Sequence, residues 1–129
     1  MFELKQEAIK AASTFLTRRG YEVLETEWTS EDGGSIDVVA LDENTIVFCD
    51  VEARHDYDEG MPAEGGEASH QRMEINAARW LGEHADDPDL VDVTIRFDNI
   101  SMLVVGEDRA LLRHHINCLG NDLTASPAA

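Results

Sequence analysis

The amino-acid sequence predicts an α/β fold in which a mixed sheet, a three-stranded antiparallel meander plus a crossover strand, is flanked by helices. Two segments with helical periodicity are separated by three consecutive strand-like segments with short connections, which is typical of a meander. Further strand-like segments follow the second helix, and a helix in this place can act as a crossover that makes the next strand parallel. A chain of 129 residues with 43% hydrophobic residues has room for one domain with one core.

The first helix is expected over residues 2–19, because apolar side chains recur at helical spacing and Gly20 follows where a helix should stop. These apolar residues are Leu4, Ala8, Ala11, Ala12, Phe15 and Leu16. Residues 21–28 alternate between apolar and polar and predict a half-buried strand. Residues 29–34, which are rich in Gly, Ser and Asp, predict a loop.

Two apolar strands, residues 36–41 and 45–53, are expected to form a hairpin through a turn at 42–44. Residues 55–66 have no periodicity and predict an acidic loop. A second helix carries Met73, Ala77, Trp80 and Leu81 on one side and is expected to end before residues 84–89. Strands at 93–105 and 110–118 complete a single domain over residues 1–119, and residues 120–129 are expected to form a flexible tail.

The charge balance limits the class of partner. There are 27 acidic and 10 basic residues, so the formal net charge is -17. Nucleic-acid binding depends on phosphate neutralisation by Lys and Arg, so this charge disfavours it, and a protein partner is the alternative. No apolar run approaches the roughly 18 residues of a membrane span, and the N-terminal segment lacks the layout of an export signal. The expected location is therefore the cytoplasm, without a membrane partner.

Three acidic residues interrupt the apolar hairpin: Asp37, Asp50 and Glu52. If residues 42–45 form the turn, Asp37 falls opposite Asp50 on the same face, with Cβ atoms roughly 5 Å apart. Glu52 shares that face because side chains alternate along a strand. Such a group of carboxylates either raises a pKa or recruits a cation, and oxygen ligands suit Mg²⁺ or Mn²⁺.

An alternative interpretation needs no metal. The strand ends can emerge into solvent, where the three acids form a hydrated rim and one of them pairs with Arg54. Arg54, Arg72 and Arg79, with His70, are candidates for a phosphate-facing surface beside the acids. Pairing with surrounding carboxylates, which contributes little to stability, is the favoured interpretation of these residues.

Several short motifs, taken in order, resemble the YraN family of small bacterial proteins, and the resemblance covers about residues 8–119. The family has a helix ending in Gly-Tyr, a strand ending in Asn-Trp, a Gly-Glu-Ile-Asp motif and a Val-Phe-Val-Glu-Val-Lys-x-Arg motif. Farther on it has a Gly-x-Pro-x-Glu segment and Arg-Phe-Asp, and near the C-terminus it has His-Ile-x-Asn. The matching residues here are Gly20-Tyr21, Glu27-Trp28, Gly34-Ser35-Ile36-Asp37, 47–54, 60–64, Arg96-Phe97-Asp98 and His115-Ile116-Asn117.

This resemblance implies a restriction-endonuclease-like core and metal-dependent phosphodiester hydrolysis on DNA, with Asp37 and Asp50 as metal ligands. Glu52 stands where the family has Lys, and the resemblance implies that it acts as a third metal ligand or a general base. The acidic residue of the family's first helix falls at about Ile9, Ser35 replaces a Glu, and Ser69 or His70 replaces a basic residue. These departures predict an activity that is weakened or lost. The alternative is a catalytically inactive nuclease fold that binds a protein partner.

Overall fold

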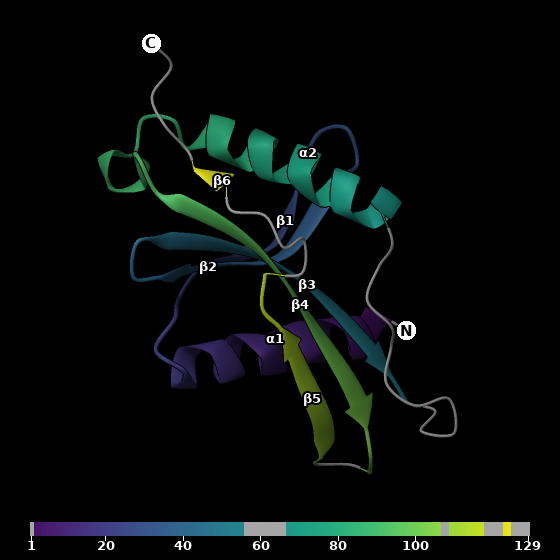
Figure 1. Cartoon of the computed structure of the whole chain (residues 1–129). Coiled ribbons are helices and arrows are strands. Elements are labelled where there is room, and N and C mark those ends of the chain that lie inside the picture. The colour runs from purple at the N-terminus through teal and green to yellow at the C-terminus, as the bar shows by residue number, and fades with distance from the viewer. Residues whose placement is uncertain (1, 56–66, 107–108, 118–122, 125–129) are drawn as a thin grey trace.

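A computed structural model of the chain describes residues 2–55, 67–106, 109–117 and 123–124 (Figure 1). The order of the two long helices and the first five strands is the predicted one, helix, three strands, helix and two strands, and a short sixth strand follows among the described residues. The elements are α1 (Phe2–Arg18), β1 (Glu22–Thr29), β2 (Ser35–Asp42), β3 (Thr45–Arg54), α2 (Glu67–Glu83), the short 3₁₀ helix η1 (Pro88–Leu90), β4 (Thr94–Val104), β5 (Ala110–His115) and β6 (Leu123–Thr124).

The sheet has the strand order β1-β2-β3-β4-β5, and β6 pairs with β4. β1, β2 and β3 pair antiparallel, as a meander does, whereas β4 lies parallel to β3 after the crossover through α2. β5 then returns antiparallel to β4. The predicted α/β fold with its mixed sheet is thus confirmed, and it is consistent with a nuclease-like fold.

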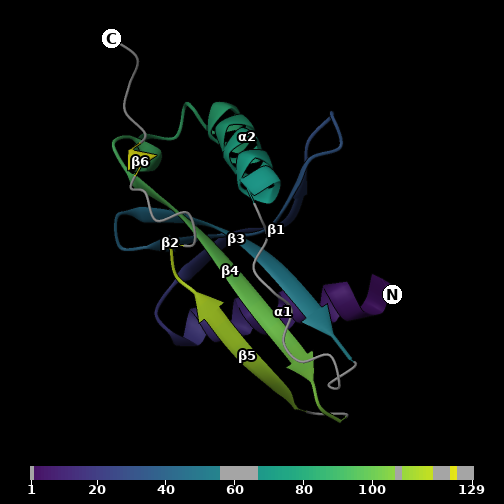
Figure 2. The same cartoon turned by 45° about the vertical axis from the view of Figure 1, so that its right-hand side comes forward.

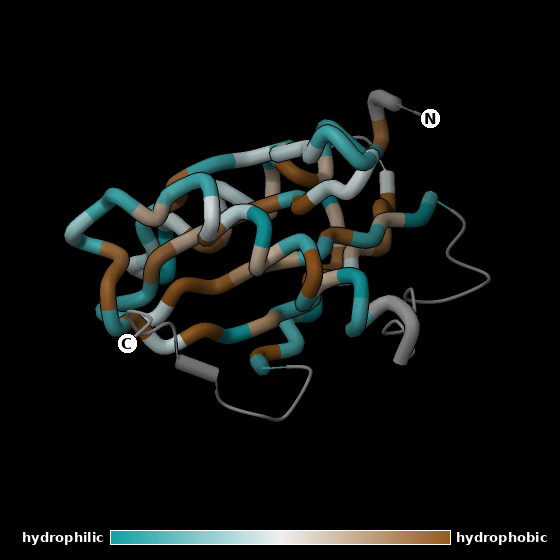
Figure 3. Tube along the Cα trace, turned by 90° about the horizontal axis from the view of Figure 1, so that it is seen from above, coloured by the Kyte–Doolittle hydropathy of each residue, from teal (hydrophilic) through white to brown (hydrophobic). Residues whose placement is uncertain are grey.

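The two helices lie on opposite faces of the sheet (Figures 1 and 2). Under α1, Ala12 and Leu16 pack against a cluster that includes Val38 and Cys49. Under α2, Trp80 packs edge-on against the ring of Phe48, which in turn stacks on Phe97. The central strands therefore bury apolar side chains on both faces, and Figure 3 shows hydrophobic segments, in brown, in the middle of the fold.

Both long helices are amphipathic. In α1, Ala8, Ile9, Ala12 and Leu16 are buried, while Gln6, Lys10 and Thr14 are exposed. Each helix has 17 residues. In the part of the chain that the structure describes, no helix is both long and apolar enough to cross a membrane.

The structure differs from the sequence-based expectation at the C-terminal strands. β5 ends at His115 and not at residue 118. Asn117 has a left-handed backbone (φ 55°), and its N–H donates to Asp98 Oδ1 at 2.8 Å, so the chain leaves the ladder there. Within the tail, the sequence did not predict β6. The other tail residues, the predicted loop at 56–66 and the matching segment 60–64 lie outside the described residues.

Candidate active site

The predicted register of the β2–β3 hairpin holds up to the pair Val38–Cys49. The next pair would be Asp37 with Asp50, and there the backbone ladder ends. Asp37 instead turns its carboxylate into the line of the ladder, where Oδ2 accepts a 2.8 Å hydrogen bond from the backbone N–H of Val51. The side chain of Asp37 thus takes the place of a backbone carbonyl at the end of the β2–β3 ladder. We call the site formed by Asp37, Asp50 and the backbone of Val51 the acidic notch.

Lys5 of α1 reaches this notch from the face of the sheet that α1 covers. Its Nζ donates to Asp37 Oδ2 at 2.9 Å and also to the backbone carbonyl of Val51. The Asp37 side chain is only 12% exposed, whereas the Lys5 side chain is 43% exposed. A buried carboxylate needs a partner, and Lys5 supplies it. The sequence alone did not indicate this role, because Lys5 lies more than thirty residues from the acidic hairpin.

Asp50 lies beside this pair on β3 and is half-buried. The pKa of Asp50 is raised to about 6, chiefly by burial and then by the negative charge of Asp37, with a smaller contribution from Glu52. The positive charges of Lys5 and Arg72 act in the opposite direction. Because these are charge interactions at short range, the acids of the hairpin and two cations share one electrostatic neighbourhood.

The remaining predicted site residues lie on β3 and α2. Glu52 is exposed, Arg54 at the end of β3 is half-buried, Arg72 of α2 is exposed, and His70 is half-buried in the first turn of α2. Among the described residues, no three His, Cys, Asp or Glu side chains already stand close enough to hold a metal ion. A metal site formed by Asp37, Asp50 and Glu52 therefore stays a prediction.

Two polar residues of β4, Asn99 and Ser101, lie beside Asp50 and Glu52 in the sheet, although the sequence did not indicate them. Asn99 on β4 pairs with Asp50 on one side and with His115 of β5 on the other. Ser101 pairs with Glu52 in the same way, and its hydroxyl donates to Asn99 Oδ1 at 3.0 Å. Asn99 and Ser101 are buried, although the neighbouring residues Ile100, Met102 and Leu103 are apolar. Two polar residues within this apolar run were the signal in the sequence.

The start of β2 is held in place by α2. Asn76 Nδ2 donates to the backbone carbonyl of Ser35 at 3.2 Å, and the N–H of Gly34 donates to Ser30 Oγ at 2.9 Å. A Cβ atom at Gly34 would lie 2.1 Å from Asn76 Oδ1. A glycine is therefore required two residues before Ile36 so that the loop can pass α2 and deliver Asp37 to the notch.

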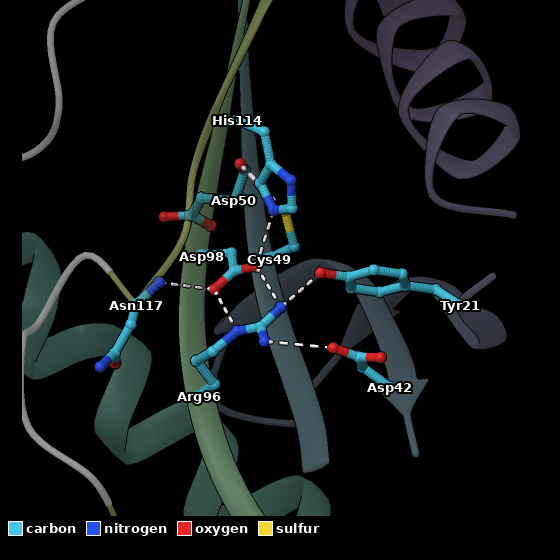
Figure 4. Close-up of polar contacts among 8 residues, drawn as sticks. All are labelled: Tyr21, Asp42, Cys49, Asp50, Arg96, Asp98, His114 and Asn117. Carbon is cyan, nitrogen blue, oxygen red and sulfur yellow. Dashed lines mark hydrogen bonds and ion pairs between the residues drawn. The ribbon is translucent and has the colours of Figure 1, made fainter. Parts of the chain in front are cut away.

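A second polar cluster lies on the α1 side of the sheet, around the fully buried Asp98 (Figure 4). Its carboxylate accepts two hydrogen bonds from Arg96, one from His114 Nε2 at 2.7 Å and one from the backbone N–H of Asn117. Arg96 also donates to the Tyr21 hydroxyl and to Asp42. Burial raises the pKa of Asp98, but the hydrogen bonds from His114, Arg96 and Asn117 outweigh it and hold the pKa below its usual value.

The comparison with known proteins shows the family. The model of the uncharacterised protein family UPF0102 matches residues 8–102, which is more than half of the chain. The chain belongs to this family. UPF0102 is the YraN family, so the resemblance that the motifs indicated is confirmed.

Individual UPF0102 proteins resemble the chain at moderate identity. A UPF0102 protein from Parafrankia sp. (strain EAN1pec) is 39% identical over 93 residues, which are 70% of this chain and 74% of the relative. One from Renibacterium salmoninarum is 31% identical over 80% of this chain and 84% of the relative. One from Flavobacterium psychrophilum is 34% identical over 68% of this chain and 70% of the relative.

The structure explains why several UPF0102 motifs are linked. Tyr21, Arg96 and Asp98 come from two separate motifs and meet in the buried cluster, and Asn117 of a third motif binds the same carboxylate. Their hydrogen bonds link residue 21, β4 and the turn after β5. His114 belongs to this cluster, while His115 pairs beside Asn99, so the two histidines lie on opposite faces as the strand period predicts. The matched residues 8–102 include Asp37, Asp50 and Glu52, whereas Lys5 precedes them.

Proposed function

We propose that this UPF0102 protein is a divalent-metal-dependent phosphodiesterase that acts on DNA, with Asp37 and Asp50 as the metal ligands. The observation that carries the proposal is the pair of acids at the notch. Asp37 is nearly buried, and its charge helps burial to raise the pKa of Asp50 to about 6. A dication at this position would relieve both the repulsion and the burial of the two charges.

The donor set fits Mg²⁺ or Mn²⁺. Both ions prefer carboxylate oxygens, and Mg²⁺ usually takes one or two carboxylates, with water and substrate oxygens completing the shell. Asp37 and Asp50 would hold the ion, and Glu52 would serve as a third ligand or as the general base. When bound, such an ion supplies Lewis-acid polarisation of the phosphate and lowers the pKa of water.

The chain's own groups have matching roles. Glu52 is exposed and is therefore accessible to solvent water as a proton acceptor. Arg54, His70 and Arg72 are the candidates for phosphate contacts, since all three lie near the end of β3 or at the start of α2. With a net charge of -17, we expect DNA binding to be weak and confined to low salt.

The test is cleavage of labelled single-stranded, duplex and branched DNA with Mg²⁺ or Mn²⁺ at low salt. We expect slow, metal-dependent cleavage that Asp37→Ala and Asp50→Asn abolish. Asp86→Ala, which removes an exposed acid just after α2, is the matched control and should cleave like the parent. Equal residual cleavage in the parent and in Asp37→Ala would mean contamination, and the nuclease proposal would fall.

The alternative function is a nuclease fold that binds a protein partner without cleaving DNA. The acid at position 52 and the overall negative charge favour it, because both oppose the approach of a polyanion. Absence of cleavage together with absence of metal binding by the parent would support this alternative.

A further inference from the structure

Lys5 reaches the acidic notch, where it pairs with Asp37, and its ammonium group has three N–H donors. One donates to Asp37 Oδ2 and a second to the backbone carbonyl of Val51. Within the described part of the chain, these are the two hydrogen bonds that Lys5 donates. Lys5 is thus held by two contacts and retains one donor for another acceptor.

A ligand can reach this donor. Lys5 and Asp37 both border a hollow of about 230 Å³ at the junction of α1, β1 and β2. The Lys5 side chain is 43% exposed. The other lining residues are Gln6, Ile9, Glu27, Trp28, Thr29 and Ser35. Trp28 gives the hollow a rigid apolar wall, since its ring is buried and its indole N–H donates to Glu83 at 3.2 Å.

The packing of α1 fixes the position of Lys5. Ile9 lies one helical turn farther along and therefore on the same side of the helix, and it is buried against the sheet together with Ala8 and Ala12. The ammonium is consequently carried by a helix that cannot withdraw without opening the core. A mobile surface lysine would lose more side-chain entropy on binding a ligand.

We propose that Lys5 is the phosphate-binding cation of this site, which anchors Asp37 in the notch and donates its remaining N–H to a phosphate oxygen of the substrate. This inference rests on the proposed phosphodiesterase function. Phosphate is an anion, and around Asp37, Asp50 and Glu52 it needs a fixed positive charge. The ammonium also repels a metal ion at the same carboxylates, so Lys5 has opposite effects on metal and on substrate.

These opposite effects define the experiment, which uses Lys5→Gln, Lys5→Arg and the control Lys10→Gln in the full chain. Lys10 is exposed on the same helix, so its replacement changes the net charge equally. Mn²⁺ affinity is measured by calorimetry without DNA, and KM and kcat are measured at saturating Mn²⁺. For Lys5→Gln we expect Mn²⁺ binding about three- to tenfold tighter and kcat/KM at least about tenfold lower, mainly through KM.

Lys5→Arg should recover part of the loss in KM, because it keeps the charge but not the geometry of the ammonium. A purely structural Lys5 would lower Mn²⁺ affinity, kcat and melting temperature together, and that result would overturn the inference. So would a Lys5→Gln variant with the KM of Lys10→Gln. If the parent binds Mn²⁺ and cleaves but Lys5→Gln is unaffected, only the role of Lys5 falls. If the parent neither binds Mn²⁺ nor cleaves DNA, the proposed function is wrong, and so is the inference that rests on it.

Discussion

Arg96 holds the buried carboxylate of Asp98 with two parallel hydrogen bonds, from Nε to Oδ1 and from Nη2 to Oδ2, each 2.9 Å long. The two residues lie on the same face of β4, two positions apart, so one strand supplies both members of the pair. Asp98 has no exposed side-chain surface, and the Arg96 side chain is 17% exposed. The pair is therefore shielded from water and from salt.

Removing the cation of this pair should be costly. We expect Arg96→Met to lower the free energy of unfolding by about 3–5 kcal/mol, because it leaves a buried carboxylate without its main partner. The control is Arg79→Met, which breaks the exposed pair with Asp32 and should cost less than about 1 kcal/mol. Urea denaturation of both variants measures the difference. Equal losses would contradict a structural role for the Asp98 cluster.

The ionised carboxylate of Asp50 should make the folded protein less stable when no divalent metal is present. The pKa of Asp50 is raised from 3.8 to about 6, so its stabilising contribution is complete below about pH 4 and is lost as the pH rises through 6. Without divalent metal, Asp50→Asn should therefore be more stable than the parent at pH 7.5, by up to roughly 3 kcal/mol. The advantage should vanish at pH 3.5.

Urea denaturation in EDTA at the two pH values measures this effect. Glu52→Gln is the matched control, because it removes an exposed acid from the same face of β3 and should change stability little at either pH. If Asp50→Asn is less stable than the parent at pH 7.5, native contacts already stabilise the charged carboxylate, and it needs no bound cation.

Divalent metal should stabilise the folded protein by mass action. At a metal concentration 100 times the dissociation constant, the gain is about 2.7 kcal/mol and raises the melting temperature. Thermal unfolding with and without Mn²⁺ checks this for the parent, for Asp37→Asn and for Asp50→Asn. Both variants should lose the metal-dependent rise, whereas Asp86→Asn should keep it. A rise that persists in Asp37→Asn would place the metal elsewhere.

The loop before β2 should not tolerate a side chain at Gly34. In Gly34→Ala, the new Cβ would meet Asn76 Oδ1 at 2.1 Å and Ser30 Oγ at 3.1 Å. We expect a loss of about 1–3 kcal/mol from overpacking and weaker Mn²⁺ binding, because the strand that carries Asp37 is displaced.

Two further variants separate the steric cause from a general effect of alanine. Gly82→Ala meets no atom within 4 Å and should stabilise α2 by roughly 0.5–1 kcal/mol. Adding Asn76→Ala to Gly34→Ala should restore part of the lost stability, since the clash disappears. Additive losses in the double variant would mean that Asn76 does not cause the strain.

Much of the fold followed from local pattern. The apolar period of α1, the alternation in β1 and the hairpin turn at 42–45 all depend on residues that are neighbours in the sequence. The predicted boundaries of these elements are therefore close to the observed ones. The end of β5 was missed because Asn117 leaves the strand to bind Asp98, which is 19 residues away in the sequence. A local pattern does not contain that contact.

The sequence by itself determined the family, the order of the elements and the acids of the hairpin, because spacing along a strand decides which side chains are neighbours. A position-by-position match to the family motif also showed that Glu52 stands where the family has a lysine. Only the tertiary structure decided that Lys5 of α1 brings a positive charge to Asp37, and that Tyr21, Arg96 and Asn117 meet at Asp98. The reason is physical: a buried charge takes its partner from whichever element the packing brings close, at any distance along the chain.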